Sequence, residues 1–343
     1  MKAVFRVDAS KEMGAGHVMR TLALGQELLS RGYAVIYLMA SIPEWAENRL
    51  RSEGIGCELV GGEECGGLRD ASRTLKFCQD FEADWLVVDG YHFSDGFRST
   101  VQASEYRVLL FDDHGGDRLL PAAVVLNQNA YADERLYRET SGYSVLLAGI
   151  DYCLIRNEFF EQRKLPTNVG ESEVRYLVTV GGTDPKRASE RILGEILEIQ
   201  ERKASVKVIS NDRSFLASME REAVPGQHKV ELIESAQNMA ECLAWADFVF
   251  TAAGSTIWEC AFMNVPVAYV LSADNQELNH QYLQRIEGGV FLGDIRQSLT
   301  EEFSEAVRYL VNEFDGAAKC NLPEVGGKGR ASVVDVMEAT LAS

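Results

Sequence analysis

The sequence predicts an α/β protein with two doubly wound domains, each built on a parallel sheet. Short apolar runs alternate with amphipathic segments along the whole chain, and one polar segment near the middle interrupts this alternation. Strand–helix alternation is typical of a parallel sheet that helices cover on both faces. The chain has 343 residues, of which 46% are hydrophobic, so it is long enough for two domains with cores of their own.

The first series of elements occupies residues 1–157 and is expected to form a Rossmann-like domain. Two segments with helical spacing lie at 17–31 and 43–54, and Gly32 is placed to end the first of them. The apolar runs that are expected to form buried strands are 4–8, 33–39, 85–89, 107–113 and 123–128.

Residues 158–173 form the polar segment, which carries a proline and a glycine and is predicted to be an interdomain linker. Residues 174–343 repeat the alternation and predict a second Rossmann-like domain, whose last helix could pack back on the first. The two domains are expected to face a cleft, since ligands bind beyond the carboxyl ends of parallel strands. Expected strands are 175–182, 205–210, 229–235, 246–254, 265–271 and 289–294, and expected helices are 185–199, 238–246, 255–263, 275–287 and 298–313.

Charge and cysteine usage narrow the class of partner. The chain has 52 acidic and 34 basic residues, a formal charge of -18, which argues against nucleic acid and anionic lipid and favours a small molecule or a protein. Seven cysteines show no paired spacing, and no apolar run approaches the roughly 20 residues of a membrane span. A cytoplasmic protein with reduced thiols and no membrane contact is therefore expected.

The sequence predicts no metal site. The five histidines are too scattered for a zinc pattern. The triplet Asp112, Asp113 and His114 is interpreted as polar chemistry at a strand end rather than as a ligand set. Asp8 and Ser10 are interpreted as residues that fix the loop before Gly14.

The turn MGAGHVMR, residues 13–20, is the first candidate site. Gly14 and Gly16 would let the backbone approach a ligand closely, although the spacing matches neither a dinucleotide fingerprint nor a P-loop. His17 stands at the start of the following helix, whose positive end disfavours the imidazolium. A neutral imidazole suits a general base, and the alternative is a histidine that only caps or packs.

Three turns of the second domain are candidates for substrate contacts. Gly182 and Thr183 offer donors for a phosphate, but an ordinary helix start capped by Asp184 explains the same pattern. Small residues at 252–254 precede a helix that begins at Ser255 and Thr256.

The remaining candidates lie close to these turns. Glu259 lies one turn into the helix that begins at Ser255, and its carboxylate is suited to binding ribose hydroxyls. The alternative is that it lies there only because a carboxylate is stabilised by the positive end of the helix dipole. Asn275 and Gln276 are suited to the hydroxyl and acetamido groups of a sugar, or they only cap a helix. All four turns are expected to face the same cleft.

The stretch FRVDASKEMGAGHVMRTLALGQEL, residues 5–28, resembles the N-terminal signature of the UDP-sugar hydrolases of pseudaminic acid biosynthesis, often called PseG. The related spore-coat polysaccharide proteins of the SpsG type share it. The resemblance covers nearly the whole chain in order, and it continues through VVDGYHF (87–93), FDDHGG (111–116), LNQNAY (126–131), LLAGIDYCLIRNEF (146–159), VGGTDPKR (180–187), AGSTIWE (253–259) and ADNQ (273–276).

This resemblance implies a two-domain glycosyltransferase-B fold and a reaction. UDP-2,4-diacetamido-2,4,6-trideoxy-β-L-altropyranose would be hydrolysed to UDP and the free sugar by water attack at the anomeric carbon, without a metal or another cofactor. His17 would be the catalytic base or water-positioning group. Gly14 and Gly16 would shape its loop, and Tyr91 would lie near the sugar. The resemblance also implies that UDP is held by Gly182, Thr183, Ser255, Thr256 and Glu259, and that Asn275 reaches the sugar or diphosphate.

One position departs from the family pattern, and two other functions stay open. Ala253 stands where a second glycine is expected, which affects the approach to the phosphate. In a glycosyltransferase of the same architecture, His17 would activate an acceptor hydroxyl instead of water. In a non-catalytic UDP-sugar-binding protein, no UDP would be released. Oligomeric state does not follow from the sequence.

Overall fold

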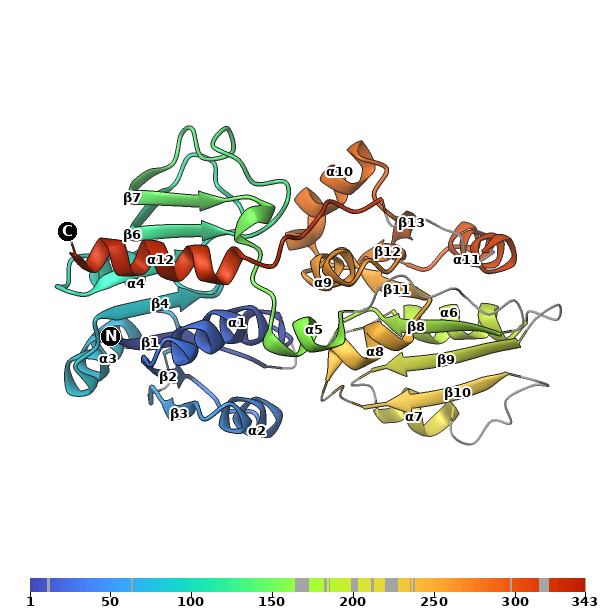
Figure 1. Ribbon diagram of the computed structural model, residues 1–343, viewed down its shortest axis with the longest axis horizontal. Helices are drawn as coiled ribbons and strands as arrows, with labels where there is room; N and C mark the ends of the chain where they lie inside the picture. The colour runs from blue at the N-terminus through green and yellow to red at the C-terminus, as the bar shows by residue number, and fades with distance from the viewer. Residues whose placement is uncertain are drawn as a thin grey trace. The chain divides into compact units, whose positions relative to one another are not determined.

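The computed structural model describes residues 1–10, 13–62, 64–163, 173–181, 184, 186–198, 203–210, 213–219, 228–234, 236, 238–296, 298–314 and 321–342. The chain forms two compact units, which Figure 1 colours along the sequence. Unit 1 comprises Met1–Asn157 together with Gly326–Ser343, and unit 2 comprises Glu158–Val325. The chain thus leaves unit 1, builds unit 2 and returns to unit 1.

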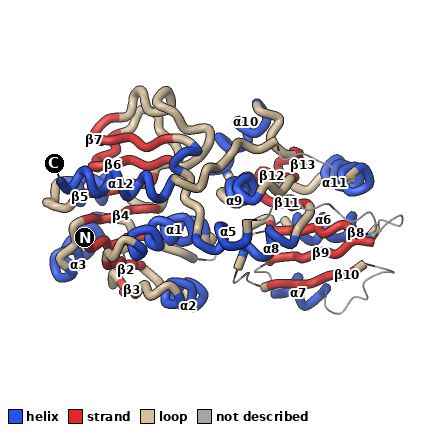
Figure 2. Tube along the Cα trace, viewed as in Figure 1, coloured by secondary structure: helices blue, strands red, loops and turns tan. Residues whose placement is uncertain are grey.

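Unit 1 is built on a parallel sheet in the order β3-β2-β1-β4-β5-β6-β7. Figure 2 shows the alternation of strands and helices that the sequence predicts. The strands are β1 Lys2–Val7, β2 Ala34–Met39, β3 Gly56–Leu59, β4 Trp85–Asp89, β5 Arg107–Phe111, β6 Leu119–Asn127 and β7 Ser141–Ala148. The helices are α1 Gly16–Ser30, α2 Glu44–Ser52, α3 Leu68–Phe81, α4 Asp95–Gln102 and α12 Gly329–Ala342, with a short η1 at Ile150–Tyr152.

Strand β1 shows why the strands of unit 1 are rich in apolar residues at successive positions. Phe5 and Val7 point to the core that α1, α2 and α12 cover, whereas Val4 points to the core that α3 and α4 cover. Alternate residues of a strand face opposite sides of the sheet, so a sheet buried on both faces needs apolar residues at successive positions.

Unit 2 repeats this architecture with a parallel sheet in the order β10-β9-β8-β11-β12-β13. Helices α6, α7 and α11 share one apolar core with the sheet, while α8 packs against β8 and α9 against β11. The strands are β8 Glu173–Thr179, β9 Lys203–Ile209, β10 Lys229–Ile233, β11 Phe248–Ala252, β12 Val267–Leu271 and β13 Val290–Asp294. The helices are α6 Ala188–Leu197, α7 Arg213–Met219, α8 Met239–Trp245, α9 Thr256–Met263, α10 Glu277–Arg285 and α11 Glu301–Glu313, with η2 at Asp274–Gln276.

Helix α12 packs on α1 within unit 1. Val333, Val334 and Met337 are fully buried in the core that α1 shares with the sheet. At its surface, Arg31 pairs with Asp335 at 2.7 Å. The last helix of the chain is therefore an integral layer of unit 1.

The segment expected to be a linker begins as a helix. Helix α5, Asn157–Gln162, carries Phe159, which is fully buried, and Phe160, whose ring lies 4.9 Å from that of Phe262. The contact between Phe160 and Phe262 anchors the start of the segment within unit 2. Residues 164–172 lie outside the described part of the chain.

Each sheet reverses its strand order at one place, between β1 and β4 in unit 1 and between β8 and β11 in unit 2. Doubly wound sheets bind ligands at such switch points, beyond the carboxyl ends of the strands. Within the described residues, no helix combines the length and apolar character that a membrane crossing needs. The six cysteines that the structure describes are free thiols, and Cys320 lies outside those residues.

Candidate active site

His17 lies in the first turn of α1, directly after β1. Gly14 adopts a φ of +73° and donates its N–H to the carbonyl of Ser10 at 2.9 Å. This left-handed conformation favours glycine because it crowds a Cβ against the backbone. The turn at Gly14 therefore lets α1 begin close to the end of β1, which places His17 at the switch point.

The imidazole of His17 contacts a buried carboxylate. Its Nδ1 lies 2.8 Å from Oδ1 of Asp89, the last residue of β4, which is only 1% exposed. Because a carboxylate accepts, the neutral imidazole carries its proton on Nδ1 and keeps a lone pair on Nε2. That Nε2 has no hydrogen-bond partner within the described part of the chain. A side chain 12% exposed in this state can take a proton from a water molecule.

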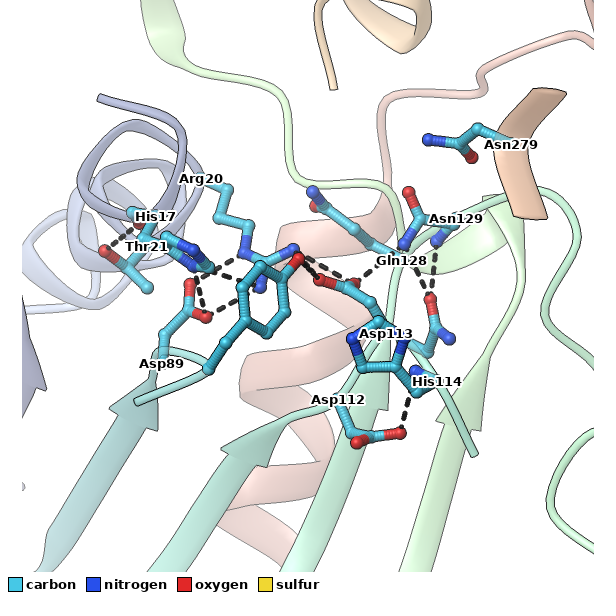
Figure 3. A network of polar contacts seen from close by, with 12 residues as sticks. His17, Arg20, Thr21, Asp89, Asp112, Asp113, His114, Gln128, Asn129 and Asn279 are labelled. Atoms are coloured by element: carbon cyan, nitrogen blue, oxygen red, sulfur yellow. Dashed lines mark hydrogen bonds and ion pairs between the residues drawn. The ribbon is translucent and has the colours of Figure 1, made fainter. Parts of the chain in front are cut away.

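Arg20 holds the Asp89 carboxylate in place. Its Nε and Nη2 each donate to Asp89 at 2.6 Å, and its Nη1 donates to Asp113 at 2.8 and 3.0 Å. Figure 3 shows His17, Arg20, Asp89 and Asp113 converging at the ends of neighbouring strands. Burial alone would raise the pKa of Asp89, but the charge of Arg20 and contacts with Arg20 and His17 outweigh it. The pKa of Asp89 therefore lies well below its usual range.

Asp113 extends this network to Tyr91. The Tyr91 hydroxyl donates to Asp113 at 2.6 Å, and Asn129 Nδ2 donates to the same carboxylate at 2.8 Å. The ring of Tyr91 meets the ring of His17 edge-on at a centroid distance of 4.8 Å. Burial opposes ionisation of Asp113, but Arg20 outweighs it and lowers the pKa of this carboxyl. Tyr91 is 45% exposed, so its ring is accessible beside the imidazole.

The fixed charges around the imidazole of His17 can stabilise positive charge that develops on the ring during a reaction. Arg20 carries one positive charge, and Asp89 and Asp113 together carry two negative charges, so the fixed groups around the imidazole sum to -1. An imidazolium formed on proton uptake is stabilised by this field, as in other histidine–carboxylate pairs. The arrangement can therefore act as a general base that needs no rearrangement of its own groups.

The turn between β11 and α9 is the second polar site. Ser255 precedes α9 and makes no side-chain cap, and the N–H groups of Ile257 and Trp258 already donate to the carbonyls of Gly254 and Ser255. The N–H groups of Ser255 and Thr256 are therefore the ones that an anion could use. A Cβ placed on Gly254 would lie 3.9 Å from Nε2 of Gln276. The other end of that amide, Oε1, accepts from the backbone N–H of Ser272 at 3.0 Å.

Asn279, which follows on α10, faces the same turn. Its Nδ2 donates to the carbonyl of Ala253 at 2.9 Å, and the residue is 5% exposed. Its Oδ1 is buried with no hydrogen-bond partner within the described residues. A buried acceptor without a donor is costly in a folded protein, and a ligand hydroxyl or N–H would relieve that cost.

The structure groups the predicted site residues by unit. Gly14, Gly16, His17 and Tyr91 lie together in unit 1. In unit 2, Ser255, Thr256 and the half-buried Glu259 share the first turn of α9, and Gln276 lies beside Gly254. Asn275 is exposed in η2.

The turn before α6 is described only in part. Gly182 and Thr183, predicted as phosphate donors, lie outside the described residues. Asp184 accepts from the backbone N–H groups of Ala188 and Ser189, both at 2.8 Å. The Asp184 carboxylate therefore binds the first two N–H groups of α6, but the N-cap position of that helix is Arg187, not Asp184 as the simpler sequence interpretation expected.

Arg20, Asp89 and Asn279 were not predicted from the sequence to be site residues. Asp113 was interpreted as a polar residue at the end of a strand, without a role in the site. Arg20 carried one usable signal, because it lies three positions after His17 and so on the same helix face. Asp89 and Asp113 are 69 and 93 positions from Arg20, so only the fold brings them together.

Part of unit 2 matches a known family of domains, and most of the chain is similar to several known proteins. Residues 176–316 match the model of the glycosyltransferase family 28 C-terminal domain. An uncharacterized protein of Methanocaldococcus jannaschii is 24% identical over 295 residues, which are 83% of this chain but 59% of that protein. The chain thus spans less than two thirds of that relative.

Two further relatives have names that describe a function. A Campylobacter jejuni protein named UDP-2,4-diacetamido-2,4,6-trideoxy-beta-L-altropyranose hydrolase is 24% identical over 298 residues, covering 83% of this chain and 97% of that protein. The spore coat polysaccharide biosynthesis protein SpsG of Bacillus subtilis is 22% identical over 271 residues, covering 78% of this chain and 77% of that protein.

Solved structures show the same architecture. MurG of Acinetobacter baumannii superposes with a TM-score of 0.63 at 17% identity, covering 99% of this chain and 100% of that one. UDP-GlcNAc 2-epimerase from Neisseria meningitidis, bound to UDP-GlcNAc, gives a TM-score of 0.63 at 12% identity, with 99% and 100% covered. The predicted fold class, two doubly wound α/β domains of the glycosyltransferase-B type, is confirmed.

Proposed function

We propose that this protein hydrolyses a UDP-linked diacetamido-trideoxy sugar and releases UDP and the free sugar. The coarse part of the proposal, an enzyme that acts on a UDP-sugar, is supported by the match to a family 28 C-terminal domain and by the glycosyltransferase-B fold. The finer part is supported by the relative from Campylobacter jejuni, whose name describes this reaction, and by the histidine–carboxylate pair of unit 1.

The observation that carries the proposal is the orientation of His17. Asp89 holds the Nδ1 side of the imidazole, and Nε2 is left to accept a proton. A water molecule that donates to Nε2 attacks the anomeric carbon as its proton moves to His17. The bond between that carbon and the diphosphate oxygen breaks, and UDP leaves with its electron pair. Attack from the face opposite UDP inverts the configuration.

UDP is a good leaving group, so the reaction needs little acid assistance compared with that of ordinary glycosidases. The proposed diphosphate site is the uncapped start of α9 at Ser255 and Thr256, where backbone N–H groups stabilise negative charge. Glu259 on the same turn is assigned to the ribose hydroxyls. Asn279 offers its buried Oδ1 to a donor of the nucleotide or the sugar.

A glycosyltransferase is the second candidate. The match of residues 176–316 to a glycosyltransferase family specifically favours it. The same His17–Asp89 pair would then deprotonate an acceptor hydroxyl instead of water, with the same departure of UDP.

The test is UDP release by the full chain from UDP-2,4-diacetamido sugars, measured with EDTA and without any acceptor. The hydrolase proposal expects many turnovers and one free sugar for each UDP released. Release that requires an added acceptor would establish the transferase instead. Binding of the UDP-sugar with no release under either condition would overturn both and leave a binding protein.

A further inference from the structure

A second polar cluster lies beside the His17 network in unit 1 and shares no side chain with it. It consists of Asp8 after β1, Cys65 before α3 and His92 after β4. One carboxylate oxygen, one sulfur and one imidazole nitrogen of these residues lie within 4.8 Å of one another. We call these three residues the Asp8 cluster.

The nitrogen and the sulfur of the Asp8 cluster both lie close to the same carboxylate oxygen. Nε2 of His92 lies 2.8 Å from Oδ2 of Asp8, and Sγ of Cys65 lies 3.3 Å from the same oxygen. In tetrahedral zinc sites, metal–ligand distances of about 2.0–2.3 Å place neighbouring ligand atoms roughly 3.3–3.6 Å apart. An increase of about half an ångström in the distance from His92 Nε2 to Asp8 Oδ2 would bring that pair to this spacing, and the 3.3 Å between Cys65 Sγ and Asp8 Oδ2 already matches it.

The other groups around the Asp8 cluster hold it in this arrangement. Oδ1 of Asp8 accepts from Arg6 Nη1 at 2.7 Å and from the N–H of Ala40 at 2.6 Å, which leaves Oδ2 directed at Cys65 and His92. Asp70 accepts from the N–H of Gly66 at 2.7 Å and so fixes the loop that carries Cys65. Such outer contacts orient the ligands in metal sites.

The charge of the surroundings suits a divalent cation. Arg6 is bound by both carboxylates, Asp70 and Asp8, so these three groups together carry a net charge of -1. Loss of the Cys65 thiol proton when the ion binds would bring the sum to -2, which a divalent ion neutralises. The Asp8 carboxylate is 4% exposed, whereas Cys65 is exposed and His92 is 21% exposed, so an ion has a route in and space for a water as fourth ligand.

We propose that Asp8, Cys65 and His92 bind a zinc ion, with a fourth position left to water. Thiolate, imidazole and carboxylate are all zinc ligands, and the sulfur argues against harder ions such as Mg²⁺, which prefer oxygen. The sequence has no zinc pattern because Cys65 and His92 are 57 and 84 positions from Asp8. The ion would anchor the loop after β4, where His92 directly follows Tyr91. The proposed reaction at His17 does not pass through it.

The test uses Co²⁺ as a spectroscopic substitute for zinc on the full chain, after treatment with a chelator and desalting. The proposal expects one Co²⁺ per chain, a thiolate-to-cobalt charge-transfer band in the near ultraviolet, and loss of that band on adding one equivalent of Zn²⁺. Cys65→Ser and His92→Ala should weaken binding on the order of a hundredfold, and Cys65→Ser should abolish the band. Cys57→Ser, which changes a half-buried thiol of β3 outside the cluster, should keep both.

A chemical measurement on the unaltered chain covers the case in which a variant fails to fold. Zinc should protect Cys65 from alkylation by iodoacetamide, as read by peptide mass spectrometry, and should leave the labelling of Cys57 unchanged. Absence of the charge-transfer band, its survival in a folded Cys65→Ser variant, or equal labelling of Cys65 with and without zinc would each overturn the proposal. None of these readouts uses a UDP-sugar, so they are independent of the proposed reaction.

Discussion

At the scale of single residues, Asp89 governs what His17 can do. Its carboxylate is buried, receives two hydrogen bonds from Arg20 and faces Nδ1 of the imidazole. A base whose tautomer and orientation are fixed in advance needs no rearrangement at the moment of reaction. Arg20 and Asp113 do not contact the reacting atoms. Arg20 holds the Asp89 carboxylate, and Asp113 accepts a hydrogen bond from Tyr91.

Asp89→Asn tests this dependence. The amide keeps the shape of the side chain but can present its NH2 group to Nδ1, which would favour the tautomer with a protonated Nε2. Turnover is expected to fall about 100- to 10,000-fold, the range for loss of a general base, with little change in UDP affinity. Asp117→Asn, at an exposed aspartate, is the matched control. Equal losses in both variants, or an unchanged rate in Asp89→Asn, would contradict the role given to Asp89.

The same carboxylates predict how stability depends on pH. The pKa values of Asp89 and Asp113 are lowered in the folded chain because Arg20 outweighs the effect of burial. A carboxyl with a depressed folded pKa stabilises the fold above its unfolded pKa and loses that contribution as the pH falls through the folded value. The Tm of unit 1 should therefore stay nearly constant from pH 7 to about pH 5 and fall steadily below about pH 4. Calorimetry at a series of pH values checks this, and an equal Tm at pH 3 and pH 7 would contradict it.

Part of this site could be predicted from the sequence. His17 and Gly14 could be identified because a histidine and a positive-φ glycine next to a strand end leave a local signature. Asp89, Asp113 and Asn279 could not, since a polar residue at a strand end has the same local pattern whether or not it meets a partner. Their roles depend on which strands are neighbours, and that information lies in the topology.

At the scale of elements, the interior strands of both sheets were predicted, and so were the edge strands β10 and β13 of unit 2, whereas the edge strands of unit 1 were not. The strands β4 and β5 each carry four successive apolar residues because both of their faces are covered. The sequence analysis missed β3 and β7, which are edge strands with mostly exposed or half-buried residues. Helices α3, α4 and α7 were also missed, and of these only α3 follows a strand that was not predicted.

The turn before α1 gives a prediction at this scale. Gly14→Ala places a Cβ on a residue with a φ of +73° and should lower the free energy of unfolding by about 1 kcal/mol, while also displacing His17 and slowing turnover. Gly16→Ala is the matched control: it lies at the first position of α1 with an ordinary φ and open space around its Cβ. Its stability should be unchanged or slightly raised, as measured by urea unfolding. An equal loss in both variants would contradict the role given to the backbone conformation of Gly14.

At the scale of the whole molecule, the chain crosses between its units twice, and α12 completes unit 1. Three fully buried side chains of α12, at about 1.5–3 kcal/mol each, contribute roughly 5–9 kcal/mol of burial. That is comparable to the whole stability of a typical domain.

A chain ending at residue 325 should therefore lose the cooperative unfolding transition of unit 1 in calorimetry. Asp335→Asn, which alters only a surface ion pair with Arg31, should leave that transition within a few degrees. Retention of the full transition by the shortened chain would contradict the place given to α12.

The central claim is that His17 takes a proton from the attacking water, while residues of unit 2 bind UDP. A substitution of His17 should therefore lower turnover without changing the affinity for UDP. The measurement is the turnover of a UDP-2,4-diacetamido sugar by wild type and His17→Ala, with the Kd for UDP of both measured by calorimetry. We expect turnover to fall by about two to four decades, the range for loss of a general base, while the Kd for UDP stays within about twofold. A parallel loss of both would make His17 structural, and an unchanged turnover would contradict the account.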